Sequence, residues 1–185
     1  MTKRSKDFLK YFEDIRLNIL YLCEELNFVP SEEQKKELIK FQQNSQSERP
    51  RTWTRLQLDR GKGNTTLTCI ILIWTQFQEW EGQGVVVSST LRGNRIWLDT
   101  FKNLIHGAKP AVKRLIRISR DGIKFYIGNL DHVIMTSMEH PERLNGLHSE
   151  NMLVILEQSW DMLGSEMMRR VNLLTGSVGT SVVAT

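Results

Sequence analysis

The chain has 185 residues and a net charge of +4, with 40% hydrophobic and 25% charged residues. That length is enough for a buried core, and the composition excludes a fibrous or wholly disordered chain. The longest apolar run, Cys69 to Trp74, is far shorter than the roughly 20 residues of a bilayer-spanning helix, which excludes transmembrane helices. Cys23 and Cys69 lie in apolar periodic segments, which indicates buried thiols of an intracellular protein rather than a disulfide framework or a zinc site.

The first 50 residues predict two helices. Apolar residues recur every three or four positions over 6–27, which is the spacing of an amphipathic helix. Val29-Pro30-Ser31 interrupts this pattern, and Ser31 is a suitable N-cap for a second helix with Glu and Gln in its first turn. The polar segment 44–51 contains Pro50 and predicts a loop or linker. We therefore expect an N-terminal helical extension over residues 1–50.

From residue 51 onward, the pattern alternates between strands and helices. Strands are expected at 53–58, 85–88, 133–137, 152–156 and 180–184. Helices are expected at 64–80, 91–105 and 162–173, and a hairpin joins 114–119 to 123–127. Strands separated by helices favour an α/β fold with a mostly parallel sheet in residues 51–185.

The first candidate site is the glycine-rich turn between a predicted strand and an apolar helix, Arg60-Gly61-Lys62-Gly63-Asn64-Thr65-Thr66. Glycines allow a tight turn whose N–H groups face a phosphate, and the helix N-terminus adds a partial positive charge. A hydroxyl from Thr65 or Thr66 would then ligate Mg²⁺. A Walker A motif has lysine where this chain has Asn64, so Lys62 or Arg60 would have to supply that charge. The alternative is an ordinary glycine turn before a helix.

The second candidate is the apolar strand 152–156, which ends at Glu157-Gln158. A buried strand that ends in acids is the Walker B arrangement, in which the first acid holds Mg²⁺ and the second acts on the attacking water. Glu157 can reach a metal, whereas Gln158 can orient a water but cannot take its proton. The alternative is a buried strand that ends at a polar pair.

Two further features accompany these motifs. Upstream of the turn, the amide of Gln34 has the donor and acceptor needed to read an adenine edge, although an ordinary surface glutamine is the alternative. Between residues 91 and 125 there are nine basic and two acidic residues. Such a local excess can attract a phosphate backbone, and the alternative is a solvated basic face.

In chain order, these segments resemble the ATPase domain of the large terminase subunit, the motor that packages DNA into tailed-phage and herpesvirus capsids. The resemblance runs from about Asn27 to Thr185. It rests on the glutamine-containing segment 26–34, the RGKGNTT turn with its apolar helix, the strand segment 84–90, and the closing segments 174–177 and 180–185. Its most specific part is the run LNGLHSENMLVIL, which leads into Glu157.

The resemblance implies a RecA-like (ASCE) P-loop core that binds ATP and Mg²⁺ and couples hydrolysis to translocation of double-stranded DNA during viral genome packaging. It also implies a homo-oligomer with portal or small-terminase-like partners, no membrane contact, and the cytoplasm of a phage-infected or prophage-carrying cell. By position, Thr65 and Glu157 would hold the metal, and Gln158 stands where the catalytic glutamate belongs. The implied nucleotide-binding residues are Gln34, Arg60, Gly61, Lys62, Gly63, Asn64, Thr65 and Thr66.

We place the DNA-facing or subunit-facing surface on the basic stretch, at Arg92, Arg95, Lys113, Arg114 and Arg117. The two departures from the family pattern, Asn64 and Gln158, predict weak or absent hydrolysis. One alternative is therefore a pseudo-ATPase that binds nucleotide, DNA or subunits without turnover, and another is a basic nucleic-acid-binding α/β module without a nucleotide site. The chain ends at Thr185 without the nuclease domain that relatives carry, so we expect no nuclease activity.

All of these roles require one geometric condition, which is that the turn near residue 62 and the acid at residue 157 meet at neighbouring strand ends.

Overall fold

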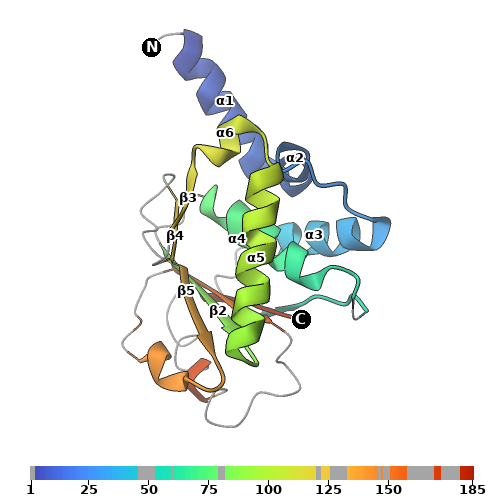
Figure 1. Ribbon diagram of the computed structural model, residues 1–185. Coiled ribbons are helices and arrows are strands. Elements are labelled where there is room, and N and C mark those ends of the chain that lie inside the picture. The colour runs from blue at the N-terminus through green and yellow to red at the C-terminus, as the bar shows by residue number, and fades with distance from the viewer. Residues whose placement is uncertain are drawn as a thin grey trace.

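The computed structural model describes residues 3–45, 53–59, 61–78, 82–119, 122–125, 133–145, 147, 151–157, 169–171 and 180–185. Five of the described strands form one parallel sheet in the order β1-β7-β6-β2-β5. They are β1 (Trp53–Arg55), β2 (Gly82–Ser88), β5 (Val133–Ser137), β6 (Asn151–Glu157) and β7 (Thr180–Ala184). Figure 1 shows two of them, β2 and β5, beside helix α5 (Leu91–Gly107). The predicted α/β class with a mostly parallel sheet is confirmed.

Helices lie at 32–45, 64–76 and 91–107, where they were predicted, and the predicted hairpin is present. The helices are α1 (Lys3–Leu17), α2 (Ile19–Glu25), α3 (Glu32–Ser45), α4 (Asn64–Gln76), α5 (Leu91–Gly107) and α6 (Pro110–Lys113), with a 3₁₀ helix η1 (Pro141–Leu144). The hairpin pairs β3 (Ile116–Ser119) with β4 (Gly122–Phe125). Of the helix predicted at 162–173, residues 169–171 are helical and the rest lies outside the described residues. None of the described helices combines the length and the apolar character needed to cross a bilayer.

The helix predicted over 6–27 is broken at Asn18. This residue has extended backbone angles (φ −144°), and its side chain accepts a hydrogen bond from Leu20 N at 2.9 Å, so that it caps α2. Gln42 of α3 bonds the backbone on both sides of the break, donating to Leu17 O (2.7 Å) and accepting from Ile19 N (2.9 Å). A polar residue in an apolar periodicity is therefore a helix boundary here, because side chains satisfy the freed backbone groups.

The sheet is buried on both faces, as a parallel sheet requires. Alternate strand residues contact the helices on one face, where Val86, Leu153, Ile155 and Val183 join one hydrophobic cluster with residues of α1 to α5. The residues between them face the opposite side and form a second cluster with Leu144 of η1 and Val171. These are Val85, Val87, Met152, Val154 and Leu156. Successive residues of a strand point to opposite faces, and here both faces are buried. This explains why β2 and β6 appear in the sequence as continuous apolar runs.

All five strands run in the same direction, so their carboxyl ends share one edge of the sheet. In the register of β2 and β6, Ser88 lies beside Glu157, and on the other side of β2 it lies beside Ser137. The strand before the glycine-rich turn, β1, is separated from β6 by β7. The expectation of neighbouring strand ends is therefore wrong, and helix α4 rather than β1 brings the turn to the acid.

Candidate functional site

The glycine-rich turn requires backbone angles that favour glycine. Gly61 has φ +86° and Gly63 has φ +90°, both in the left-handed region that side chains with a Cβ rarely adopt. Gly63 is the N-cap of α4 and has no side chain to cap it. The turn thus leaves the first N–H groups of a 13-residue helix without a side-chain partner, which is the local arrangement that favours an anion.

Gln34 lies against this turn. Ser31 and Gln34 form a capping box at the start of α3, with Gln34 N donating to Ser31 Oγ (3.3 Å) and Ser31 N donating to Gln34 Oε1 (2.9 Å). The other end of the amide, Nε2, donates to Lys62 O at 2.8 Å. A Cβ on Gly63 would lie 2.6 Å from that nitrogen. The residue predicted to read adenine is thus placed beside the turn, and both ends of its amide bond the chain itself.

The ammonium of Lys62 is paired with two carboxylates. Its Nζ lies 2.9 Å from Glu33 Oε2 and 3.2 Å from Asp59 Oδ2, and these partners raise the pKa of Lys62. The side chain remains 45% exposed, so solvent screens the pairs and they can exchange. Lys62 is therefore positioned on the turn, but its charge is shared with two acids.

Asn64, which stands where a Walker A lysine is expected, is directed back toward the strand side of the turn. Its Nδ2 donates to Leu58 O at 3.3 Å, and its buried Oδ1 has no partner among the described residues. An unsatisfied buried acceptor costs about 1–3 kcal/mol. Asn64 thus brings no positive charge to the turn.

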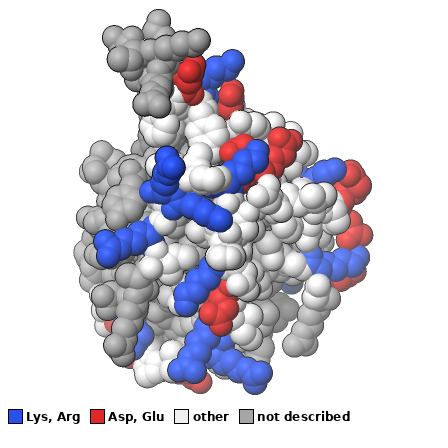
Figure 2. All heavy atoms as spheres, turned by 45° about the horizontal axis from the view of Figure 1, so that its top comes forward, with Lys and Arg blue, Asp and Glu red and all other residues white. Residues whose placement is uncertain are grey.

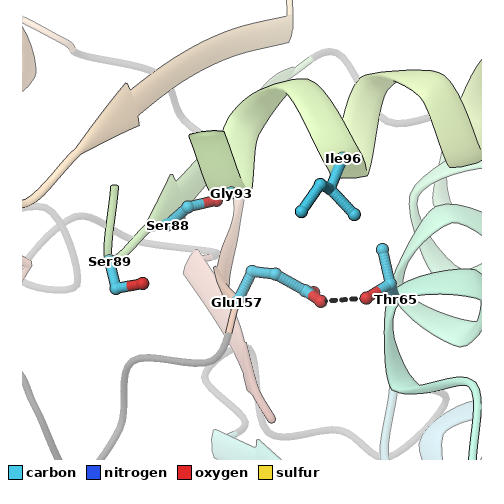
Figure 3. Close-up of a pocket in the computed structure, with 6 residues that line it drawn as sticks. All are labelled: Thr65, Ser88, Ser89, Gly93, Ile96 and Glu157. Atoms are coloured by element: carbon cyan, nitrogen blue, oxygen red, sulfur yellow. Dashed lines mark hydrogen bonds between the residues drawn. The ribbon is translucent and has the colours of Figure 1, made fainter. Parts of the chain in front are cut away.

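Glu157 is the centre of the site (Figure 3). It is the last residue of β6 and is 2% exposed. Thr65 Oγ1, from the first turn of α4, donates to Glu157 Oε1, and Thr68 Oγ1 donates to Oε2 at 3.0 Å. Trp97 Nε1 of α5 in turn donates to Thr68 Oγ1 at 3.0 Å. Residues from α4, α5 and β6 therefore meet at one buried carboxylate.

Burial raises the pKa of the Glu157 carboxyl, and the hydrogen bonds from Thr65 and Thr68 offset this only in part. No basic side chain among the described residues pairs with this carboxylate. Because the pKa is higher in the folded than in the unfolded state, the stability from this group is present at low pH and is lost as the pH rises through the folded pKa. Above this raised pKa the ionised carboxylate destabilises the fold, and a bound cation would offset that cost.

The carboxylate lies beside a small cavity lined by Thr65, Ser88, Ser89, Gly93, Ile96 and Glu157 (Figure 3). Its volume is about 10 Å³, close to the minimum that holds one water molecule. Within the described part of the chain, no three His, Cys, Asp or Glu side chains gather as a metal site. The oxygen donors of Thr65 and Glu157 suit Mg²⁺, which binds through one or two protein ligands, water and phosphate oxygens.

The structure brings some of the predicted site residues together and separates others. Thr65 and Glu157 are in contact, and Gln34, Lys62 and Gly63 form one group on the turn. Thr66 is half-buried in the first turn of α4, while Arg60 and Gln158 lie outside the described residues. Sequence reasoning missed Thr68 and Ser88. Thr68 is one helical turn from Thr65, and Ser88 ends a predicted strand. These two sequence positions were the signals that could have identified them as site residues.

The predicted nucleic-acid-binding residues are all exposed, and they lie on α5, at the end of α6 and on β3. None of them lines the cavity beside Glu157. Figure 2 shows basic side chains predominating over the middle of this side of the molecule. We call the surface formed by Arg92, Arg95, Lys113, Arg114 and Arg117 the basic face. No ion pair joins any of these five to an acid among the described residues, whereas Lys35, Lys40 and Lys62 are each paired.

Neither a protein-family model nor a curated protein matches the sequence. Among solved structures, the chain is similar to an arginine-to-alanine mutant of the large terminase ATPase domain of Thermus phage P74-26. The TM-score is 0.52 at 13% identity, covering 88% of this chain and 68% of that one. A second structure of that ATPase domain has a TM-score of 0.50 at 13% identity and covers 88% of this chain and 67% of that one. The chain therefore has an α/β fold similar to that of a phage large-terminase ATPase domain, and the predicted resemblance is confirmed at the level of the fold.

Proposed function

We propose that the chain is a terminase-like ATPase domain in which ATP lies on the glycine-rich turn and Mg²⁺ is held by Thr65 and Glu157. The observation that supports this most is the contact between the Thr65 hydroxyl and the buried Glu157 carboxylate. A hydroxyl in the first turn of a helix after a glycine turn, beside an acid at the end of a central strand, is the arrangement that holds a metal next to phosphates in P-loop NTPases.

The chain's own residues have separable tasks in this proposal. Gly61 and Gly63 let the backbone N–H groups face a phosphate, and Gln34 holds the turn against α3. Lys62 must exchange Glu33 and Asp59 for phosphate oxygens to contribute its charge. Bound Mg²⁺ would neutralise phosphate charge. With Asn64 and Gln158 in place of the expected lysine and glutamate, hydrolysis is slow, and binding without turnover is the alternative function.

Gly63→Ala is expected to weaken ATP binding by about tenfold, or about 1.4 kcal/mol, because the added Cβ would disturb the turn whose N–H groups face the phosphate. The new Cβ would also lie 2.6 Å from Gln34 Nε2 and push the amide from Lys62. The matched control is Gly61→Ala, which has a similar φ but nothing within 4 Å of the added Cβ. Calorimetric titration with ATP and Mg²⁺ measures both, and an absence of binding heat from the wild-type chain would contradict the proposed function.

We further propose that the basic face contacts the DNA backbone, which is the translocation substrate of a packaging motor. Five exposed cations without acidic partners in the described structure favour a phosphate polymer through counterion release. Translocation implies a homo-oligomer around the DNA, portal or small-terminase-like partners, and the cytoplasm of an infected or prophage-carrying cell. If the turn binds no nucleotide, the basic face alone supports the other alternative, a nucleic-acid-binding α/β module.

Arg114→Gln with Arg117→Gln is expected to weaken binding to double-stranded DNA regardless of its sequence. The slope of log K against log salt should fall by about two, since each lost phosphate contact removes about one unit. The control is Lys35→Gln with Lys40→Gln, which removes two lysines that are paired with Glu32 and Glu37 on α3. Fluorescence anisotropy at several salt concentrations measures the slope. An unchanged slope in the arginine variant would place DNA binding elsewhere.

A further inference from the structure

Ser88 has a buried hydroxyl with no partner beside the Glu157 cavity. It is the last residue of β2, is 1% exposed, and its Oγ makes no hydrogen bond to any described group. It lines the cavity together with Thr65 and Glu157 (Figure 3), and the strand register places it next to Glu157. An unpaired buried hydroxyl is unfavourable, so its place in a native fold calls for an explanation.

The packing around Ser88 depends on a glycine. Thr90 caps α5 by accepting a hydrogen bond from Gly93 N at 3.1 Å, which brings the first turn of α5 over the end of β2. A Cβ on Gly93 would lie 2.9 Å from Ser88 Cβ and 3.4 Å from Ser88 Oγ. The bare glycine therefore leaves just enough room for the serine, and α5 holds it at the cavity.

The neighbouring strand offers a comparison. Ser137 is the register partner of Ser88 on β5, and it is also a fully buried serine at the end of a strand. Its hydroxyl is directed to Glu139, with Oγ 3.5 Å from Oε2, and it does not line the cavity. Of these two serines, only Ser88 combines an unpaired hydroxyl with a place beside the buried carboxylate.

We infer that Ser88 is a positioning residue whose hydroxyl holds a water ligand of the divalent cation between Thr65 and Glu157. This inference rests on the proposed function. The cavity has room for about one water molecule, and Mg²⁺ usually keeps several waters when proteins bind it. A protein group that orients such a ligand tunes metal affinity without touching the metal. Ser88 thereby acquires the partner that its buried hydroxyl lacks.

The test measures how much a divalent cation improves nucleotide binding. The affinity for a non-hydrolysable ATP analogue is determined with Mn²⁺ and with EDTA, and the ratio of the two dissociation constants is the metal-dependent gain. Ser88→Ala is expected to reduce this gain by about tenfold or more, in the range found for groups that orient metal ligands, and to leave the EDTA value unchanged. A purely structural role would change both values. The metal-free variant should unfold at the wild-type temperature or above, because it loses an unpaired buried hydroxyl.

Two further variants make each outcome decisive. Ser137→Ala is the matched control and should retain the full gain, while Thr65→Ala should lose it. If Thr65→Ala loses the gain and Ser88→Ala keeps it, the inference about Ser88 is wrong and the proposed site stands. If Ser88→Ala lowers the thermal stability or the EDTA affinity, its role is structural and the inference fails. If the wild-type chain shows no gain with Mn²⁺, the proposed function fails and the inference fails with it.

Discussion

Asn64→Lys combined with Gln158→Glu is expected to raise the rate of ATP hydrolysis by at least about 100-fold, because groups that stabilise transferring phosphate or position the attacking water each contribute orders of magnitude. The proposed function attributes slow turnover to these two positions. Asn64→Lys would remove few interactions. Asn64 makes one long hydrogen bond, to Leu58 O at 3.3 Å, and its Oδ1 has no partner among the described residues. A lysine there would give up little existing structure.

Phosphate release at saturating ATP and Mg²⁺ measures the rate, and the single variants separate the two contributions. Asn64→Lys alone should tighten ATP binding, whereas Gln158→Glu alone should act on the rate. Thr66→Lys is the matched control, because it adds the same charge two residues further along α4. Tighter binding without turnover in the double variant would favour a binding module over a motor. Equal effects of Asn64→Lys and Thr66→Lys would show that charge alone, and not a phosphate site on the turn, explains the change.

Trp74→Ala is expected to lower the free energy of unfolding by about 3–5 kcal/mol, the usual loss on truncating a buried tryptophan. Trp74 is fully buried in α4, its Nε1 donates to Ile15 O of α1 at 3.0 Å, and its ring meets Phe41 of α3 edge-on with centroids 6.0 Å apart. It therefore joins the N-terminal helices to the helix that carries Thr65 and Thr68. A domain of this size is stable by only about 5–15 kcal/mol, so the loss is a large fraction of the total.

Urea unfolding measures this effect, with two variants for comparison. Trp74→Phe keeps a ring but removes one donor to Ile15 O, which still accepts from Asn18 N at 3.3 Å. It should cost about 0.5–1.5 kcal/mol for the lost hydrogen bond. Val29→Ala changes a side chain that is 90% exposed and should stay within about 0.5 kcal/mol of wild type. If Trp74→Ala unfolds at the same urea concentration as Val29→Ala, the N-terminal helices do not depend on Trp74 for their attachment.

Local patterns predicted most of the elements well. The strands at 133–137 and 180–184 have the predicted bounds, and the strands ending at Ser88 and Glu157 lie where apolar runs indicated. The errors came from a polar residue whose role depends on a distant partner and from element boundaries, such as β1 ending at Arg55 rather than Leu58. Asn18 interrupts a helix because Gln42 satisfies the broken backbone, and α6 begins at Pro110, which the sequence suggested only as the end of α5. Periodicity contains no information about such partners.

For the site, sequence reasoning selected Thr65 and Glu157 separately, and the fold placed them in contact. It could not show that Lys62 is shared between Glu33 and Asp59, that Gln34 bonds the turn, or that Thr68 and Trp97 support the carboxylate. Lys62 and Asp59 are three positions apart, but each of the other contacts joins residues more than 20 positions apart. The assigned chemical roles of the site residues stay predictions until nucleotide and metal binding are measured.

By itself, the sequence determined the α/β class, the positions of the apolar strands and the glycine turn, because these depend on periodicity and on the backbone freedom of single residues. Only the tertiary structure decided the strand order, with β7 between β1 and β6, and the burial of Glu157 against α4. The physical reason is that desolvation and hydrogen-bond partners depend on which distant segments pack together. The raised pKa of Glu157 and the unpaired hydroxyl of Ser88 exist only once β2, β6, α4 and α5 have met.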